Sequence, residues 1–429
     1  MNWGAWTLAL GVAGAGLAAG PAARAQAPEP LRLTRRQAVD TALAHNPALA
    51  AAREQVEESR AQLVQDVAFP DLTLSADVTG QSSLVRPGSN TGHDLGVGLL
   101  VPFPTKFHWR GVMGHADLSA AEFAYQQQRQ QTASQAAQAY DALLVTEQHR
   151  ADLTEGRRLA QEFLDKTQAR YGAGTVAGLD VIKARVDLAQ ADNDLIASER
   201  DLANARAALN RLMGRLLGAD VEPAESLAVP AALPDLAALE DTARAERPEL
   251  KSLAIQQHGA SAASSLARSF WMPDLSVGLA QNSAAGTPST YTTSVGFSLP
   301  LFFWNHTRGE VSQAQHRELE LSAAYRDLEA QVDQDVRTTY AAAATALRQA
   351  IFLRDQLLPE ARRAYQVALV SYGLGGSSAL DVLDARRTLL DAESQYADAL
   401  GAANDARADL ERAIGRPLEF AAGDPTHER

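Results

Sequence analysis

The sequence predicts a mostly helical α+β protein in which one structural repeat, made of long helices and a β-hairpin, occurs twice. Three observations support this prediction. The second half of the chain matches the first at a nearly constant shift, long stretches have helical periodicity, and four short runs alternate between apolar and polar residues. With 429 residues, the chain is long enough for two ordinary domains or one elongated domain.

The duplication is clearest in two segments that each begin with a tyrosine. "YGAGTVAGLDV" from Tyr171 aligns without a gap with "YGLGGSSALDV" from Tyr372, so the shift is 372 − 171 = 201 residues. The same shift places Asp180 on Asp381 and the segment "NPAL" on "RPEL". We therefore expect a signal peptide over 1–25, a first repeat over 26–220, a linker over 221–234, a second repeat over 235–417 and a tail over 418–429.

The amino-terminal segment is typical of a secretory signal peptide. An apolar run from Ala5 to Ala19 is followed by small residues that end at Ala25. The chain has no cysteine, which excludes disulfides, thiolate metal sites and a lipid on an N-terminal cysteine. The formal net charge of −13 argues against a non-specific nucleic-acid partner. We therefore expect an exported protein that is not lipidated.

Each repeat contains two short runs with the alternation of a β-strand. They predict one hairpin over 71–101 and another over 274–299, with Leu, Val or Phe on one side and mostly Ser, Thr or Gly on the other. A sheet packed on an ordinary core is one interpretation, but the long helices offer no second sheet to cover it. Strands of about nine residues also suit a transmembrane β-barrel. Because bacterial barrels begin at about eight strands, four strands predict a barrel that several copies share.

The remaining segments predict rod-like helices. The stretches 111–171 and 309–372 each contain about 60 residues, which corresponds to about 90 Å of helix. Gly156 and Pro359 predict a break or bend within these rods. The helix that follows each glycine-rich turn has a seven-residue apolar period. That period predicts a coiled-coil seam between antiparallel helices.

Together these features resemble the TolC-like family of outer-membrane efflux proteins. The resemblance covers nearly the whole chain after the signal peptide, and its most specific parts are the duplication and the two tip segments, 171–180 and 372–384. The segment "VGFSLPLFFWNHTRGEVSQAQ" from Val295 also resembles the heavy-metal, CusC/CzcC-like branch. The resemblance implies a homotrimer in the outer-membrane lipid, in which the hairpins build one transmembrane β-barrel and the helices a periplasmic α-barrel.

The same resemblance implies a function. The protein would be the outer-membrane exit duct of a tripartite efflux (RND-type) or type I secretion system, a passive channel gated at its periplasmic tip. Its partners would be a periplasmic adaptor and an inner-membrane pump, and it would need no cofactor. The duct itself does not indicate whether metal ions, drugs or peptides pass through it.

Two aspartates three residues apart mark the second tip. On a helix, Asp381 and Asp384 share a face in the first turn, where acidic residues commonly cap free N–H groups and favour the helix dipole. The resemblance implies another role, a pore constriction or gate at the closed mouth, to which each chain contributes this pair. The first tip keeps Asp180 but has Lys183 in place of the second aspartate, so the two tips are not equivalent.

The resemblance further implies a lock at the mouth. In the family, a tyrosine ahead of the second tip bonds an aspartate of the first tip, and the matching residues here are Tyr372 and Asp180. The arginine that usually supports the lock is replaced by Ser377. Packing at a helix end is the alternative role of Tyr372. The residues expected to face the adaptor are Tyr171, Gly172, Gly174, Gly373 and Gly375.

The residue patterns do not indicate an enzyme or a metal site. The nine histidines show no H-x-x-x-H or H-E-x-x-H spacing, and the sequence contains no nucleophile elbow or phosphate-binding loop. We therefore expect neither catalysis nor a bound metal. A periplasmic coiled-coil adaptor or scaffold of a transport complex is the alternative function at this point.

Overall fold

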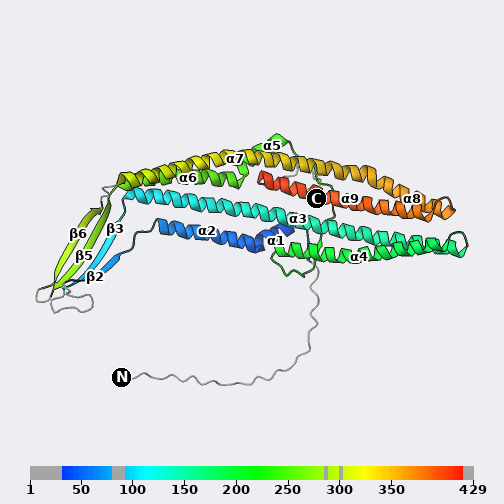
Figure 1. The fold of residues 1–429 in the computed structure, drawn as a ribbon, viewed down its shortest axis with the longest axis horizontal. Helices are drawn as coiled ribbons and strands as arrows, with labels where there is room; N and C mark the ends of the chain where they lie inside the picture. Colours follow the sequence, from blue (N-terminus) through cyan, green and yellow to red (C-terminus); the bar gives the residue numbers. More distant parts are fainter. Residues whose placement is uncertain (1–30, 80–91, 285–287, 299–302, 419–429) are drawn as a thin grey trace, which may run out of the picture.

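The molecule is a long bundle of helices with a small β-sheet at one end and two helical turns at the other (Figure 1). The structure is a computed structural model that describes residues 31–79, 92–284, 288–298 and 303–418. The expected signal peptide over 1–25 and residues 419–429 of the expected tail lie outside the described residues. Within those described ranges, no helix is both long enough and apolar enough to cross a membrane.

The two halves contain equivalent helices in the same order. The first half consists of β1 (Leu31–Leu33), α1 (Arg35–His45), α2 (Pro47–Asp66), β2 (Thr73–Thr79), β3 (Gly92–Val101), α3 (Pro104–Gly172), α4 (Gly178–Leu212) and β4 (Val221–Pro223). The second half consists of α5 (Leu236–Glu246), α6 (Pro248–Arg268), η1 (Ser269–Trp271), β5 (Asp274–Ala284), β6 (Thr290–Ser298), α7 (Phe303–Phe352), η2 (Leu353–Leu357), α8 (Leu358–Leu374) and α9 (Ala379–Ile414). Equivalent helices start 201 residues apart, as for α1 and α5 (236 − 35 = 201) and for α4 and α9 (379 − 178 = 201).

The helices have a fixed lateral order. Toward the turns, α4 packs on α3, α3 on α9, and α9 on α8. Toward the sheet, α2 packs on α3, α3 on α6, and α6 on α7. The helix α3 is therefore an inner member along the whole bundle, whereas α2 and α4 form one edge and α7 and α8 form the other. Buried apolar clusters fill the spaces between them, and burial of one side chain such as Phe163 contributes about 1.5–3 kcal/mol.

Half-way along the bundle, the end of α4 meets the junction of α1 and α2. Asn46 caps α2, and its side-chain amide donates to the carbonyl of Leu212 at 2.9 Å. Gly214 has a φ of 66°, and a Cβ at this position would lie 2.4 Å from the carbonyl oxygen of His45. Only glycine fits this close approach at little cost. Gly415, with a φ of 81°, holds the equivalent position in the second repeat.

Gly156 and Pro359, the two positions of the predicted breaks, have different effects on their helices. The helix α3 continues as one helix through Gly156, where a Cβ would lie only 2.7 Å from Leu390 of α9. In this repeat the glycine therefore allows a close approach between helices and does not end one. In the second repeat the α-helix is interrupted by the π-helical turn η2, just ahead of Pro359. Proline lacks an N–H group and its ring crowds the carbonyl four residues earlier, and the wider turn accommodates both effects.

The sheet has one apolar face and one polar face. It is antiparallel with the strand order β2-β3-β5-β6. Leu74, Val97 and Leu279 lie opposite one another on one face, and Ser75 and Gly96 lie on the other. The apolar row faces solvent in the single chain, since 82% of Leu74 and 61% of Leu279 are exposed. An exposed apolar face between two open edge strands is typical of an incomplete assembly.

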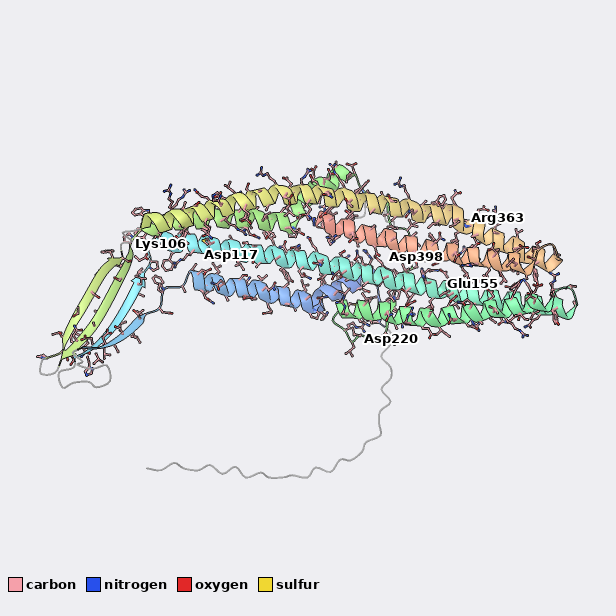
Figure 2. The ribbon with its side chains drawn as sticks, in the orientation of Figure 1. Lys106, Asp117, Glu155, Asp220, Arg363 and Asp398 are labelled. Atoms are coloured by element: carbon pink, nitrogen blue, oxygen red, sulfur yellow. The ribbon has the colours of Figure 1, made fainter. Side chains whose placement is uncertain are left out.

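A partly buried ion pair joins the sheet to the bundle. Lys106 lies in the first turn of α3, beside the sheet (Figure 2). Its ammonium lies 2.8 Å from the carboxylate of Asp274 at the start of β5. The same carboxylate accepts the backbone N–H of Phe103 at 3.0 Å. Lys106 is 8% exposed, so the pair is largely shielded from water. The contact holds the junction between β3 and α3 against the junction between η1 and β5.

Candidate functional site at the helical turns

The two turns at the end of the bundle have the same backbone geometry. Gly174 (φ 73°) and Gly375 (φ 85°) adopt the left-handed conformation that glycine enters at little cost. Gly172 and Gly373 lie near the helix ends, where an added Cβ would meet nothing within 4 Å. Tyr171 is 55% exposed. The five residues expected to face an adaptor thus lie together at the exposed end of the molecule (Figure 1).

The equivalent tyrosine of the second repeat is buried. Tyr372 is 1% exposed, and its ring centre lies 5.3 Å from that of Phe163. Its hydroxyl donates to Oγ1 of Thr167 at 3.3 Å. The guanidinium of Arg170 lies 4.7 Å from the ring centre and also donates to the main-chain carbonyl of Tyr372. A cation over an aromatic face and a charge-assisted hydrogen bond therefore join the end of α3 to the end of α8.

In the single chain the hydroxyl of Tyr372 bonds Thr167 and not Asp180. Asp180 is half-buried in the first turn of α4, and its carboxylate has no hydrogen-bond partner among the described residues. Ser377, which stands where the family has an arginine, donates to the carbonyl of Ala368 at 3.0 Å. The sequence does not indicate Arg170, because a basic residue in the last turn of a helix usually serves the helix dipole. Its contact with Tyr372 depends on how the two hairpins pack.

The two aspartates of the second tip have different surroundings. Asp381 forms a capping box with Ser378, whose backbone N–H and hydroxyl both donate to its carboxylate at 2.8 Å. These hydrogen bonds lower the pKa of Asp381 below its ordinary value. Asp384 is exposed, and its carboxylate has no partner in the described part of the chain. Helix capping therefore accounts for Asp381, whereas Asp384 is left available for another role.

A largely buried ion pair lies about two helical turns from the second tip. Arg386 of α9 is 6% exposed, pairs with Asp187 of α4, and donates to the carbonyl of Gly156 in α3 at 3.1 Å. Tyr365 of α8 is buried in the apolar cluster of the same region. Burial and, after it, the Glu162 carboxylate raise the pKa of Tyr365 to about 12, and Arg386 and Asp187 are among the other charges that act on its hydroxyl. Sequence periodicity places Arg386 on a helix but does not reveal this contact between hairpins.

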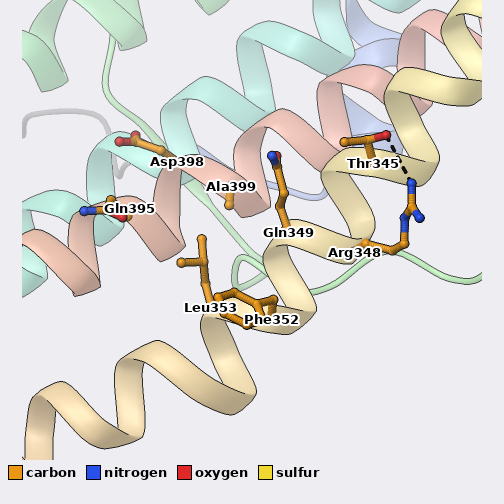
Figure 3. A pocket seen from close by; sticks show the side chains of 8 residues that line it. All are labelled: Thr345, Arg348, Gln349, Phe352, Leu353, Gln395, Asp398 and Ala399. Carbon is orange, nitrogen blue, oxygen red and sulfur yellow. Dashed lines mark hydrogen bonds between the residues drawn. The ribbon is translucent and has the colours of Figure 1, made fainter.

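Other surface features do not suggest a reaction. A groove of about 620 Å³ lies between α7, η2 and α9, with Phe352 and Leu353 on one side and the polar residues Gln395 and Asp398 on the other (Figure 3). The labelled charged side chains of Figure 2, from Lys106 beside the sheet to Glu155 and Arg363 toward the turns, lie at different places along the bundle. Among the residues that the structure describes, no group of three or more His, Asp or Glu side chains could hold a metal ion.

Comparison with known proteins shows which family has this architecture. The model of the family described as Outer membrane efflux protein matches residues 38–215 and 239–416. The cobalt-zinc-cadmium resistance protein CzcC of Cupriavidus metallidurans is 25% identical over 295 residues, which cover 66% of this chain and 67% of CzcC. The pyoverdine export outer membrane protein OpmQ of Pseudomonas putida is 25% identical over 380 residues, which cover 82% of this chain and 79% of OpmQ. Among solved structures, CusC has a TM-score of 0.76 at 19% identity, covering 90% of this chain and 93% of CusC.

A duplicated helical bundle that carries an open-edged sheet at one end and two exposed turns at the other defines a channel subunit of the outer membrane. The two matched segments correspond to the two repeats and together span most of the chain. The chain belongs to the outer membrane efflux protein family. It is therefore an outer-membrane protein with a periplasmic extension, and it acts as a passive channel and not as an enzyme.

Proposed function

We propose that three copies of this chain form a continuous duct, with a shared β-barrel in the outer membrane and a helical tube in the periplasm that is gated at its tips. The duct would be the exit of a tripartite efflux (RND-type) or type I secretion system. The observation that carries this proposal is that the chain has two open edges along its length, and that these edges are complementary to each other.

The sheet supplies the first part of this argument. The strands β2 and β6 are the outer members of the four-stranded sheet, and both have backbone groups free to pair. Pairing β6 of one copy with β2 of the next removes the open edges, which a stable membrane-spanning sheet requires. The exposed apolar row that contains Leu74 and Leu279 would then face lipid. The Ser, Thr and Gly face would line a polar lumen.

The helices supply the second part. An apolar stripe at helical spacing runs along the outer edge of α4, and a second stripe runs along the outer edge of α8. The first stripe is Leu179, Ile182 and Val186, and the second is Val367, Val370 and Leu374; each of the six side chains is at least 59% exposed. Exposed apolar stripes on both edges of a helical layer favour association with further copies.

The two stripes also match in height, that is, in their distance from the tips along the bundle axis. Ile182 is 182 − 178 = 4 residues past the start of α4, and Val370 is 374 − 370 = 4 residues before the end of α8. Both helices end at the tips, so these residues lie at about the same height in one chain (Figure 1). Rotation about an axis along the bundle leaves height unchanged, so Ile182 of one copy would meet Val370 of the next. Such a contact is heterologous and closes into a ring.

The gate in this proposal lies at the tips. Three copies would place Asp384, with Asp381 beside it, around one axis at the narrow mouth. Carboxylates gathered in this way repel one another and attract cations. Tyr372 would act as the lock through Arg170 and Thr167, and the unpaired Asp180 would be free to join that lock in the assembled mouth. The exposed turns around Tyr171 would meet the periplasmic adaptor.

The pump is expected to determine the cargo. One relative is named for cobalt, zinc and cadmium resistance and the other for pyoverdine export, although each is 25% identical to this chain over the matched residues. A duct of one architecture can thus serve a metal pump or a siderophore exporter. We therefore propose no cargo for this chain beyond what its adaptor and inner-membrane pump deliver.

Single-channel recording in planar lipid bilayers tests the proposal. The wild-type protein should insert as a trimer and give a small, cation-preferring conductance, because the mouth is closed. Asp384→Ala should give the same channel with weaker block by added divalent cations. If inserted wild-type protein and Asp384→Ala both gave no current steps, the duct would be disproved.

A further inference from the structure

Four residues from four helices lie close to one another at the apolar core near the tips. They are Gly156 of α3, Asp187 of α4, Tyr365 of α8 and Arg386 of α9, and we call them the buried node. Arg386 pairs with Asp187 and donates to the Gly156 carbonyl at 3.1 Å. Tyr365 is 4% exposed, and its hydroxyl has no protein partner among the described residues. Among the described residues, Nε of Arg386 and Oδ2 of Asp187 also have no hydrogen-bond partner.

Stability alone does not account for the buried node. The surrounding core is apolar and includes Phe163, Val181 and Val382. A buried ion pair loses the hydration of both charges, and an apolar pair of similar volume is often at least as stable. What the node does provide is specificity. Arg386 contacts both Asp187 and the Gly156 carbonyl while the two hairpins pack as they do in this structure.

The contact made by Arg386 has no counterpart in the first repeat. The residue equivalent to Arg386 in the first repeat is Arg185 (386 − 201 = 185). Arg185 is exposed and forms no ion pair within the described part of the chain. The residue equivalent to Gly156 is Leu357 of η2 (156 + 201 = 357). Arg386 therefore reaches from the second hairpin into the first, whereas no equivalent side chain reaches back.

We propose that the buried node is a latch that joins the two hairpins of one chain and is released when the mouth opens. This inference rests on the proposed function, since it assigns a role to residues above the proposed gate. Moving α8 and α9 away from α3 and α4 separates Arg386 from Asp187 and exposes both charges to water. Hydration then stabilises the open form while the ion pair stabilises the closed form. The free-energy difference between the open and closed forms is then small enough that a docking partner with higher affinity for the open form can shift the equilibrium toward it.

The variant Asp187→Asn tests the latch, and Asp192→Asn is its matched control. Both carboxylates lie on α4 and both pair with an arginine. The partner of Asp192 is Arg157, which is exposed and belongs to the same hairpin. In bilayers without adaptor or pump, Asp187→Asn should raise the open fraction about tenfold or more, because it breaks a buried pair. Asp192→Asn should leave it unchanged within about twofold, because an exposed pair contributes little.

A distance measurement separates opening from a general loss of packing. The chain has no cysteine, so spin labels at Ala173→Cys and Leu374→Cys report the separation of the two turns. Asp187→Asn should add a longer distance, and Asp192→Asn should not. If Asp187→Asn assembled normally and left both the open fraction and the distance unchanged, the latch would be wrong while the duct would stand. If no variant and no wild-type sample conducted, the proposed function would fail instead.

A second variant covers the case in which Asp187→Asn does not assemble. The double variant Asp187→Leu with Arg386→Met fills the core without charge. It removes the hydration gain of the open form, so we expect it to assemble and to have an open fraction below that of the wild type. An open fraction equal to or above the wild-type value in this double variant would overturn the latch.

Discussion

The guanidinium of Arg170 lies over the ring of Tyr372 and donates to the main-chain carbonyl of the same residue, so the two repeats are joined at their turns. The hydroxyl of Tyr372 makes a longer hydrogen bond of 3.3 Å to Thr167. Most of this contact therefore depends on the ring and the backbone of Tyr372, and little of it depends on the hydroxyl.

This division predicts unequal effects for two substitutions at the tip. Arg170→Met removes the cation from the ring face and the charged donor from the carbonyl, which together are worth about 2 kcal/mol. Tyr372→Phe removes one long hydrogen bond, worth about 1 kcal/mol or less. Chemical unfolding and the open fraction in bilayers should both rank Arg170→Met as the stronger change. The reverse ranking would mean that the lock works through the hydroxyl, as it would if Asp180 were its partner in the assembled mouth.

The two aspartates of the second tip should separate stability from conduction. Asp381→Ala removes the capping box with Ser378 and should lower the melting temperature of the protein. Because the pKa of Asp381 is lowered from 3.8, this stabilisation is present at neutral pH and is lost as the pH falls through the folded-state value. Asp384→Ala should leave the melting temperature unchanged and reduce cation selectivity, measured as a reversal potential in a salt gradient. Unchanged selectivity in Asp384→Ala and in the double variant Asp381→Ala with Asp384→Ala would exclude a carboxylate ring.

The repeat made much of this fold predictable, because local signals occur twice. Gly174 and Gly375 mark two turns with the same left-handed residue, and the helices that follow them start 201 residues apart. Contacts between hairpins were not predictable in the same way. Arg170 and Arg386 each lie in an ordinary helical pattern, and their partners are 202 and 199 residues away in sequence. No local preference of a residue encodes which distant carbonyl or carboxylate it will meet.

The open edges of the chain predict where copies meet. A chain with Ile182→Cys and Val370→Cys should form disulfides between copies and give a ladder up to trimer on a denaturing gel. A bond within one chain is excluded, because α3 and α9 lie between α4 and α8. The control pairs Ile182→Cys with Leu319→Cys, which is exposed on the same edge but far from the tips, and it should remain monomeric on the gel. Equal cross-linking of both pairs would indicate random collision and would remove support for this seam.

Glycines at two kinds of position should respond in opposite ways to alanine. Gly214 has a left-handed backbone, and a Cβ there would lie 2.4 Å from the His45 carbonyl oxygen, so Gly214→Ala should cost at least about 1–3 kcal/mol. Gly172 is helical with open space around it, so Gly172→Ala should be neutral or stabilising by up to about 1 kcal/mol. Urea midpoints of the two variants measure the difference. A neutral Gly214→Ala would show that the junction at His45 can relax.

Asp405 on α9 predicts a pH dependence that originates in the middle of the bundle. Burial, together with the nearby carboxylates of Asp141 and Asp409, raises its pKa from an ordinary 3.8 to about 6, while Arg35 opposes the shift. A carboxyl with a raised pKa binds its proton more tightly in the folded state. The free energy of unfolding should therefore fall as the pH rises from about 4 to about 6, and it should be level above that range.

Asp405→Asn keeps the size of this side chain and removes the charge. At pH 7 it should raise the free energy of unfolding by about 1–2 kcal/mol, a value already reduced for solvent screening because Asp405 is only partly buried. It should also flatten the slope between pH 4 and 6, measured from urea midpoints at each pH. Asp201→Asn, on the exposed face of α4, is the control and should preserve the slope. If the slope survived in Asp405→Asn, another group would have to carry the proton, because Asp405 would then titrate alike in the folded and unfolded chain.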